Sequence, residues 1–369
     1  SMMKRTHSRW SRLPHAYSTT QKIMHTARPA YHHQQLRGHK IGPKSQSRAQ
    51  STLHPPIEAS QLQQTMPANN TSSTATTASH TGSTHSGIHT RFASELNDEL
   101  IPNYLHDTYW WAYTNPNAVK FWERQFLVDA ILWGNFNTLK KQAIHELHAL
   151  LASQPYQVHS KQRNYRLRVT QIACVYGNFS TDLIAELASI YKYNKMDDAK
   201  YTYKIVDIAP IQLVNTKQKI DRYLTEHRVS DHEQWTNAAL DVELYQSDSM
   251  DLQVMHDGSE DITYLFFLLH EQPKEVRLKT LAEAIRITKP GGRIVIVDYH
   301  KPTSQVNPFR YIMYPILTYL EPFAIDLWNE EITDYIRDLS VGQQWNVQME
   351  KTLFFNGLYQ KIVLRKGGT

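Results

Sequence analysis

From about residue 98 onward, the sequence predicts an α/β domain with a Rossmann-like, mostly parallel sheet. Short apolar runs, typical of buried strands, alternate with amphipathic helical stretches across this region. One helical stretch ends at Lys289-Pro290-Gly291-Gly292, directly before another apolar run. Near the C-terminus two runs flank Asn356-Gly357, a turn signal that predicts an antiparallel hairpin. Strands separated by helices indicate a parallel sheet, in which the connections between strands are right-handed crossovers.

The first quarter of the chain has a different composition. Residues 1–57 contain ten Lys and Arg, many Ser, Thr and His, and no Asp or Glu. This composition is typical of a mitochondrial transit peptide, so we predict a transit-type leader here, with a solvated basic tail as the alternative. Residues 58–97 are predicted to form a disordered linker, because residues 67–90 have too few large apolar side chains to offset the entropy of ordering.

Charge is divided unequally between this leader and the rest of the chain. Residues 1–94 hold eleven basic residues and one acid, Glu58, whereas the remaining residues hold 29 basic and 34 acidic ones. The basic character therefore lies outside the predicted folded part, which argues against a nucleic-acid partner. The single cysteine, Cys174, excludes a disulfide framework and a multi-cysteine zinc site.

Residues 98–160 are predicted to form helices that precede the sheet. Large apolar residues recur at three- and four-residue steps between Tyr104 and Gln154. Asn115-Pro116 marks a helix start and Gly134-Asn135 marks a break, so two or three helices fit this region. We expect them to form a helical cap, which in folds of this kind commonly lies over the cofactor cleft, with residues 161–369 forming the Rossmann-like domain.

Strand and helix signals then follow one another in order. Five apolar runs are predicted as parallel strands, at residues 168–175, 203–206, 242–245, 262–269 and 293–297. Helices are predicted between them at residues 181–191, 212–226 and 274–288, and hairpin strands at 347–354 and 359–364. Five βα units closed by a C-terminal hairpin are the order of class I methyltransferases, which bind S-adenosylmethionine.

In open parallel sheets, ligands bind at the carboxyl ends of the strands, so the residues there are the cofactor candidates. Tyr176-Gly177-Asn178 follows the first predicted strand, where such folds have a glycine-rich turn that presents backbone amides. Asp207 ends the second strand and is placed to accept the ribose hydroxyls, and Asp248 follows the third and is placed to bind the adenine amino group. A helix N-cap is the alternative for both acids. We also count Phe267 among the cofactor-binding candidates.

Imidazoles and carboxylates gather after the fourth and fifth predicted strands, at His270-Glu271 and Asp298-Tyr299-His300. His270, Glu271, Asp298 and His300 offer oxygen and nitrogen donors that suit Mn²⁺ or Mg²⁺. The same groups suit general acid–base catalysis, and the sequence leaves both chemistries open. The alternative is that Glu271 is an N-terminal helix charge and His300 is solvated. As catalytic candidates we select Tyr176, His270, Glu271 and Tyr299.

The stretch from Phe309 to Trp328 contains many large apolar residues, interrupted by Pro315, Glu321, Pro322 and Asp326. These interruptions make it too broken to span a bilayer. Such a segment suits an apolar substrate pocket or a membrane interface, and an ordinary core helix is the alternative.

Several runs resemble those of the RquA family of rhodoquinone biosynthesis proteins, found in some bacteria and in some mitochondria. The resemblance covers residues 98–365, and its most distinctive runs are Phe266–Pro273 and Val297–His300. Other similar runs are Tyr109–Tyr113, Ile131–Asn135, Val175–Asn178 and Leu320–Ala324. The resemblance implies a methyltransferase-like fold that converts ubiquinone to rhodoquinone. In that reaction an amino group from S-adenosyl-L-methionine replaces a ring methoxy group, and a manganese ion (Mn²⁺) is required.

The resemblance further implies ubiquinone as the substrate and a peripheral position at the mitochondrial inner membrane. A tyrosine at position 176, where glycine is expected, should reshape the pocket around the methionine part of the cofactor. The family often has an acid where this chain has Asn178, so no acid–base or metal role carries over to that residue. An S-adenosylmethionine-dependent quinone or lipid methyltransferase, and a non-catalytic quinone-binding assembly protein, are the alternative functions.

Overall fold

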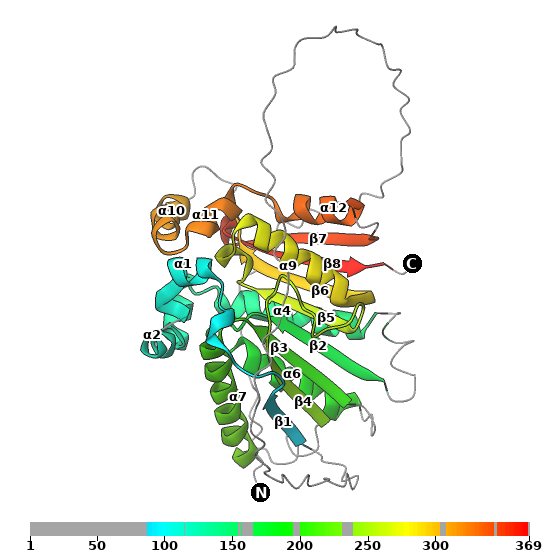
Figure 1. Cartoon of the computed structure of the whole chain (residues 1–369). Helices are drawn as coiled ribbons and strands as arrows, with labels where there is room; N and C mark the ends of the chain where they lie inside the picture. The colour runs from blue at the N-terminus through cyan, green and yellow to red at the C-terminus, as the bar shows by residue number, and fades with distance from the viewer. Residues whose placement is uncertain are drawn as a thin grey trace, which may run out of the picture. The chain divides into compact units, whose positions relative to one another are not determined.

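An eight-stranded, mostly parallel sheet organises the chain in this computed structural model (Figure 1). The strand order is β1-β4-β3-β2-β5-β6-β8-β7, and β8 pairs antiparallel with both β6 and β7. The predicted fold class, a Rossmann-like parallel sheet closed by an antiparallel hairpin, is therefore confirmed. The strands are β1 (Gly87–Phe92), β2 (Arg166–Ile172), β3 (Lys200–Asp207), β4 (Ala239–Gln246), β5 (Glu260–Phe266), β6 (Thr288–Tyr299), β7 (Val347–Phe354) and β8 (Tyr359–Lys366).

The structure describes residues 87–113, 115–153, 156, 165–194, 200–230, 239–302, 308–342 and 345–367. The predicted transit-type leader and most of the predicted linker lie outside these residues. The α-helices within them are α1 (Asn103–Tyr113), α2 (Pro116–Trp122), α3 (Gln125–Ile131), α4 (Phe136–Leu151), α6 (Phe179–Asn194), α7 (Pro210–Ser230), α9 (Lys274–Ile287), α10 (Pro308–Leu320), α11 (Pro322–Trp328) and α12 (Ile332–Gly342). Three short 3₁₀ turns are η1 (Asp98–Leu100), η2 (Leu269–Glu271) and η3 (Phe355–Gly357).

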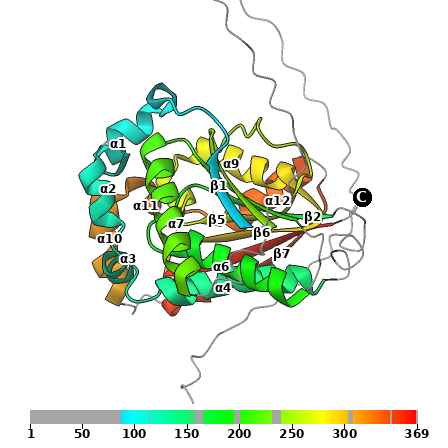
Figure 2. The same cartoon turned by 90° about the horizontal axis from the view of Figure 1, so that it is seen from below.

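Helices cover both faces of the sheet, because its strands carry apolar side chains on both faces (Figure 2). On β6, Val295 and Val297 join the core that includes side chains of α4, α6 and α7. Ile294 and Ile296 of the same strand join the other core, which includes side chains of α9 and α12. A sheet buried on both faces needs the near-continuous apolar runs that the sequence contains.

Short helices lie at the edge where the parallel strands end. There α1, α2 and α3 lie on the same side of the sheet as α10 and α11 (Figures 1 and 2). Tyr104 of α1 contacts Phe323 of α11 with ring centroids 6.2 Å apart, and Trp133 contacts Phe309 of α10 at 4.8 Å. The sequence analysis placed α4 in this helical cap, but α4 instead packs in the core of the sheet, with Leu139 fully buried. Among the described helices, none is long and apolar enough to cross a membrane.

The Lys-Pro-Gly-Gly segment lies inside β6 rather than before it. Helix α9 ends at Ile287 and β6 begins at Thr288, so no separate turn joins the two. Gly291 has a φ of +82°, and a Cβ on Gly292 would lie 2.8 Å from the Asp261 carbonyl oxygen. Both glycines are therefore required by backbone geometry and by the close approach of β5.

Residues 87–92 form an edge strand, β1, although the sequence places them in the linker. This strand pairs in parallel with β4 along all six residues, and Arg91 forms an ion pair with Glu243 of β4. Its only buried side chain is Ile88, which is 2% exposed. An edge strand held mainly by backbone hydrogen bonds has no strong apolar pattern. The prediction of a linker that extends to residue 97 is therefore wrong from residue 87 onward.

A chain that begins at residue 94 should be less stable than a chain that begins at residue 85, because it lacks β1. Losing the buried side chain of an isoleucine alone costs about 2–5 kcal/mol. In a domain of this size, 1 kcal/mol shifts the thermal midpoint by about 2–4 °C, so we expect a midpoint lower by at least about 4 °C in circular dichroism. Equal midpoints for the two chains would show that β1 adds no stability.

Candidate active site

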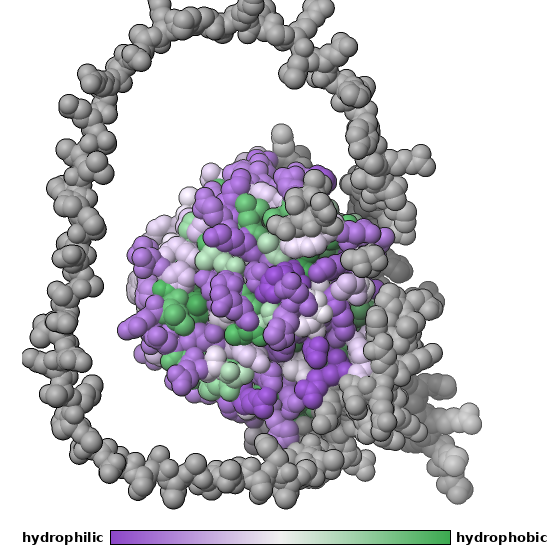
Figure 3. Space-filling view, turned by 45° about the vertical axis from the view of Figure 1, so that its right-hand side comes forward, coloured by the Kyte–Doolittle hydropathy of each residue, from purple (hydrophilic) through white to green (hydrophobic). Residues whose placement is uncertain are grey.

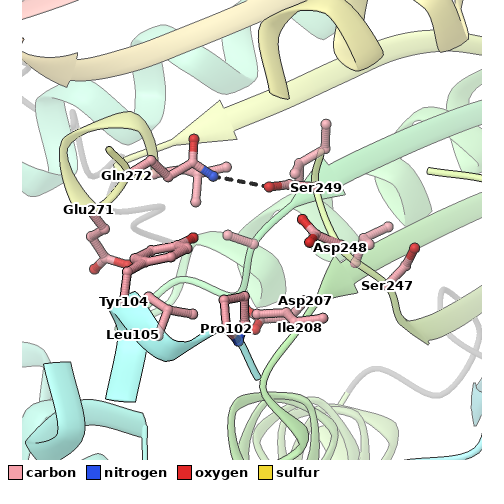
Figure 4. A pocket seen from close by; sticks show the side chains of 14 residues that line it. Pro102, Tyr104, Leu105, Asp207, Ile208, Ser247, Asp248, Ser249, Glu271 and Gln272 are labelled. Carbon is pink, nitrogen blue, oxygen red and sulfur yellow. Dashed lines mark hydrogen bonds between the residues drawn. The ribbon is translucent and has the colours of Figure 1, made fainter. Parts of the chain in front are cut away.

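A cleft opens where β2, β3, β4 and β5 end, beneath the start of α1 (Figure 4). Its empty volume is about 440 Å³, including the opening to solvent. Its lining residues are Pro102, Tyr104, Leu105, Ile172, Ala173, Val206, Asp207, Ile208, Ser247, Asp248, Ser249, Leu268, Glu271 and Gln272.

The lining of this cleft has one sign of charge. Asp207, Asp248 and Glu271 contribute carboxylates, and none of the described lining residues is Lys, Arg or His. Carboxylates attract a cationic ligand and repel a phosphate, and the low dielectric of a cleft strengthens both effects. The cleft therefore favours a ligand that carries positive charge.

Asp207 ends β3 and is buried. Its Oδ2 accepts a hydrogen bond from the Cys174 backbone N–H at 2.7 Å, and its Oδ1 accepts one from the Ala209 N–H at 2.8 Å. Burial raises the pKa of this carboxyl to about 6, and the backbone hydrogen bonds oppose the rise. The carboxylate thus joins the turn after β2 to the start of α7. Because Asp207 lines the cleft, its carboxylate can also meet a ligand hydroxyl there.

The opposite wall of the cleft comes from the ends of β4 and β5. Asp248 Oδ1 accepts a backbone N–H of its own turn at 2.9 Å, and Gln272 Nε2 donates to Ser249 Oγ at 3.0 Å (Figure 4). The ring of Tyr104 lies beside Glu271 in this view. Burial, together with the carboxylates of Asp248 and Glu271, raises the pKa of Tyr104. The Tyr104 hydroxyl therefore remains a neutral donor among acids.

The turn after β2 contains one glycine, Gly177, with a φ of +81°. A Cβ on this residue would lie 3.0 Å from Gln125 Oε1 and 3.1 Å from the Phe136 ring. The left-handed backbone and the close approach of α3 and α4 both require glycine here. Its N–H donates to Glu123 Oε1 at 3.2 Å, so the amide of the turn faces a carboxylate from the end of α2.

Lys219 of α7 holds the same turn in place. Its Nζ donates to Glu123 Oε1 at 2.7 Å and to the carbonyl oxygens of Val175 and Gly177 at 3.0 and 2.7 Å. Asn215 Nδ2 donates to the second oxygen of Glu123 at 2.9 Å. Sequence reasoning missed Glu123 and Lys219, because they come from separate helices and no local motif marks either one.

The residues on either side of this glycine are engaged within the protein. Gln212 Nε2 donates to the Tyr176 hydroxyl at 2.8 Å, and burial raises the pKa of that phenol. Lys140 Nζ donates to Asn178 Oδ1 at 2.7 Å, and the Asn178 carbonyl accepts an N–H from the first turn of α6 at 3.0 Å. Neither residue lines the cleft. The Asn178 side chain therefore joins α4 to the start of α6 rather than facing a cofactor in the cleft.

Phe267 and Tyr299 belong to an aromatic cluster and not to the lining of the cleft. Phe267 has a φ of +56°, and its ring centroid lies 5.5 Å from that of Tyr299 and 6.0 Å from that of His270. The rings of His270 and Tyr299 are 4.9 Å apart. Both aromatic residues thus shape the surroundings of the histidine, and Phe267 does not line the cleft as a cofactor contact would.

His270 is held between two carboxylates. Its Nδ1 lies 2.9 Å from Asp298 Oδ1, and its Nε2 lies 3.2 Å from Glu321 Oε2. Burial lowers the pKa of His270, but the carboxylates of Asp298 and Glu321 outweigh burial and raise it to about 9. The imidazole is therefore a cation at neutral pH. Because the pKa of His270 is raised on folding, protonation of this imidazole stabilises the fold. The contribution is fully present at a pH below 6.5, the ordinary pKa of histidine, and it is lost as the pH rises through about 9.

The structure does not bring the four predicted metal ligands together. Asp298 faces His270, and Glu271 lines the cleft. His300 Nδ1 lies 2.8 Å from the Gly357 carbonyl oxygen, and its Nε2 lies 3.3 Å from Glu331 Oε1. Among the described residues, no group of three or more His, Cys, Asp or Glu side chains is placed to hold a metal ion. The predicted four-ligand set is therefore wrong, because β6 ends one residue before His300 and the chain leaves the sheet there.

Two residues that sequence reasoning missed complete the surroundings of the histidine. One is Glu321, which directly precedes α11. The other is Arg277 of α9, whose fully buried guanidinium donates to the carbonyls of Leu269, Gln272 and Phe323 at 2.9, 2.8 and 3.1 Å. This guanidinium ties η2 to α11 and so fixes the imidazole against its second carboxylate. In the sequence, an arginine on an amphipathic helix gives no sign that it is buried.

The model of the ubiE/COQ5 methyltransferase family matches residues 155–340 of the chain, just over half of its 369 residues. This span contains the five strands β2 to β6, the three carboxylates of the cleft and the group formed by His270, Asp298 and Glu321. A search of curated proteins gives no significant match.

Similar solved structures have low sequence identity and low TM-scores. An O-methyltransferase family protein from Burkholderia thailandensis is 15% identical with a TM-score of 0.38, and the match covers 70% of this chain and 64% of that one, less than two thirds of its length. A possible exported protein from Bordetella parapertussis is 13% identical, with a TM-score of 0.37 and coverage of 61% and 79%. A SAM-dependent methyltransferase from Aquifex aeolicus is 15% identical, with a TM-score of 0.33 and coverage of 60% and 96%.

Gly177→Ala should cost more stability than Gly134→Ala. Both glycines have a left-handed backbone, with φ of +81° and +72°, so both substitutions incur the strain of an L-residue, roughly 1–2 kcal/mol. Only Gly177 also has close neighbours, since a Cβ on Gly134 would meet nothing within 4 Å. We expect urea denaturation to show a larger loss of unfolding free energy for Gly177→Ala. Equal losses would mean that the contacts with α3 and α4 relax without cost.

Proposed function

Because this chain belongs to the ubiE/COQ5 methyltransferase family, we propose that it is an S-adenosylmethionine-dependent transferase that converts ubiquinone to rhodoquinone by transferring an amino group. The lining of the cleft carries the cofactor assignment, since its three carboxylates favour a ligand with positive charge and the sulfonium group of the cofactor supplies one. Phosphate-bearing nucleotides would be repelled there. The resemblance of Phe266–Pro273 and Val297–His300 to the RquA family supports the amino transfer and the quinone substrate.

Asp207 and Asp248 are the proposed partners of the adenosine part. Asp207 accepts the ribose hydroxyls when it is ionised, which its pKa of about 6 permits at neutral pH. Asp248 accepts the adenine amino group from the other side of the cleft. Glu271 and the Tyr104 hydroxyl complete the lining of the same cleft (Figure 4).

The turn at Gly177 is the proposed site of the methionine part of the cofactor. Glu123 and Lys219 present opposite charges beside this turn, as the ammonium and carboxylate of an amino acid require. Tyr176 packs next to them and sets the width of the site. When bound, S-adenosylmethionine supplies the amino group that enters the quinone ring.

His270 and Tyr299 are the proposed residues on the acceptor side, where the histidine presents a fixed positive charge. Such a charge stabilises the negative charge that develops on a quinone oxygen during attack at the ring. The manganese ion that the resemblance implies finds no matching donor set among the described residues. None of the roles proposed here passes through a metal.

Incubation with ubiquinone and S-adenosylmethionine labelled at its α-nitrogen, with and without Mn²⁺, tests this function. We expect rhodoquinone that carries the label, detected by mass spectrometry. Asp207→Ala should reduce product formation at limiting cofactor, because a charge-assisted hydrogen bond is worth roughly 1.5–3 kcal/mol, or about 10- to 150-fold in affinity. Saturating cofactor should restore most of the rate. Asp257→Ala, which changes an exposed acid, is the control.

Family membership by itself favours a second candidate, methyl transfer to a quinone or a lipid. The two candidates differ in which atom of the cofactor reaches the product. A product that carries a labelled methyl group, with no label from the α-nitrogen, would replace amino transfer by methyl transfer. Cofactor binding without either product would point to a non-catalytic quinone-binding protein.

We place the protein at the surface of the mitochondrial inner membrane, where its apolar substrate resides. Most exposed large apolar side chains of the described residues lie on α10 or the helical cap, and α10 has a single charged residue, Arg310. Interfacial helices bury such an apolar face at the boundary between headgroups and acyl chains. The face in Figure 3 is mainly hydrophilic, with apolar side chains in small patches. The transit-type composition of residues 1–57 supports the mitochondrial location.

Ile312→Glu should weaken binding to vesicles of phosphatidylcholine and cardiolipin. Ile312 is 45% exposed on α10, and removing one apolar side chain from an interface costs about 1.5–3 kcal/mol, or roughly tenfold or more in partitioning. Val254→Glu makes the same change at a residue that is 43% exposed and outside these helices, so it serves as the control in vesicle sedimentation. Equal binding of the two variants would remove α10 from the membrane contact.

A further inference from the structure

Glu321 combines a buried oxygen with a partly exposed side chain. Its Oε2 is buried, lies 3.2 Å from His270 Nε2 and accepts no hydrogen bond from any described residue. The side chain as a whole is 20% exposed. A buried carboxylate oxygen normally accepts hydrogen bonds, and a native exception often marks a functional group. This carboxylate is therefore positioned both to pair with the imidazole and to meet a ligand.

Three tyrosines surround Glu321. The hydroxyls of Tyr109, Tyr299 and Tyr359 are close enough to the carboxylate to sense its charge. The Tyr359 hydroxyl is buried and has no hydrogen-bond partner among the described residues. The cofactor cleft is adjacent, because Leu268 and the η2 residue Glu271 line it.

We infer that Glu321 is the group that exchanges protons with the acceptor ring, with His270 and Asp298 as its positioning partners. Asp298 holds the imidazole through Nδ1. The imidazole in turn pairs through Nε2 with the Glu321 carboxylate and places a positive charge beside it. This role rests on the proposed function. It adds the residue that precedes α11 to the candidates that the strand ends supply.

The proton exchange balances for the proposed amino transfer. A carbon–nitrogen bond forms at the ring, and the bond from the ring to the methoxy oxygen breaks. The attacking amine loses one proton to Glu321, and Glu321 returns one proton to the methoxide, which leaves as methanol. The carboxylate thus ends in its starting state, and the displacement leaves a secondary amine that still joins the ring to the α-carbon of the cofactor. The amino group remains on the ring when the bond from nitrogen to the α-carbon then breaks: the neighbouring β-carbon loses a proton, the rest of the cofactor leaves with a double bond between these two carbons, and the nitrogen takes up a proton. Neither the displacement nor this elimination needs an oxidant or reductant.

Charges on every neighbouring element tune this carboxylate. Burial raises the pKa of Glu321, the His270 cation lowers it, and Asp298 raises it further. The other titratable or charged groups that face this site are Glu271 of η2, Tyr109 of α1, Tyr299 of β6, Tyr359 of β8 and Arg277 of α9. A carboxyl whose pKa is raised toward neutrality can both take up and release a proton in one turnover.

Glu321→Gln and Glu331→Gln form a matched pair of variants. Each removes the charge of a carboxylate that pairs with a buried histidine, at 3.2 Å for His270 and 3.3 Å for His300. We expect Glu321→Gln to lower kcat by about 100-fold or more, with cofactor KM within about twofold. Glu331→Gln should leave kcat within about twofold. Glu321→Asp keeps the charge on a side chain that is one methylene shorter, and it should restore about a tenth or more of the lost rate.

A structural role for Glu321 would not change the pH dependence, so the pH profile decides. The acidic limb of kcat should disappear in Glu321→Gln and remain in Glu331→Gln. In nuclear magnetic resonance, the titration midpoint of His270, about 9 in the parent protein, should fall in Glu321→Gln because one of its two carboxylates is gone. Turnover of Glu321→Gln within about twofold of the parent, or an unchanged profile, overturns the inference. A parent protein that forms no quinone product overturns the proposed function first, and this role with it.

Discussion

The geometry of the site depends on one buried carboxylate, that of Asp298 at the end of β6. Its Oδ2 accepts the backbone N–H groups of Leu269 and His270 at 2.8 and 3.3 Å. Its Oδ1 accepts the Tyr299 N–H at 2.7 Å and pairs with His270 Nδ1 at 2.9 Å. A buried carboxylate is costly unless its lone pairs are satisfied, and four donors satisfy this one. As a result η2 turns back onto β6, the imidazole takes one orientation, and Nε2 is left to face Glu321.

A second buried charge, the Arg277 guanidinium, connects η2 to α11. Arg277 joins carbonyls around η2 and in α11, and its NH1 donates to Glu330 at 3.1 Å. Because a guanidinium is planar with five donors, it can bridge several fixed acceptors at once, which a lysine cannot. Removing it would leave three carbonyl oxygens without this donor. The pairing of His270 with Glu321 is thus a consequence of tertiary packing around Arg277 rather than of either residue's own segment.

This dependence explains which parts of the site the sequence could predict. The strand ends were predictable, and with them Asp207 and Asp248, because a parallel strand is a local apolar run that ends at a polar residue. Glu321 and Lys219 were not, since they reach the site from the N-terminal end of α11 and from α7 through contacts between distant segments. His300 was misplaced for a different reason. Alternation along a strand puts residues 298 and 300 on one face, but β6 ends between them and the periodicity ends with it.

The turn after β2 shows how packing replaces a glycine-rich sequence. Such turns usually leave several backbone amides open to a ligand. In this chain Lys219 donates hydrogen bonds to two carbonyls of the turn, and Glu123 accepts one from the Gly177 N–H. The turn is thus held by an ion pair between α2 and α7, and opposite side-chain charges stand where open amides would be. A charged ligand at this turn would compete with the ion pair between Glu123 and Lys219. In the adjoining cleft, the charged groups of the described lining residues are all carboxylates. The two halves of the site therefore differ in charge: the cleft carries carboxylates alone, and the turn carries one charge of each sign.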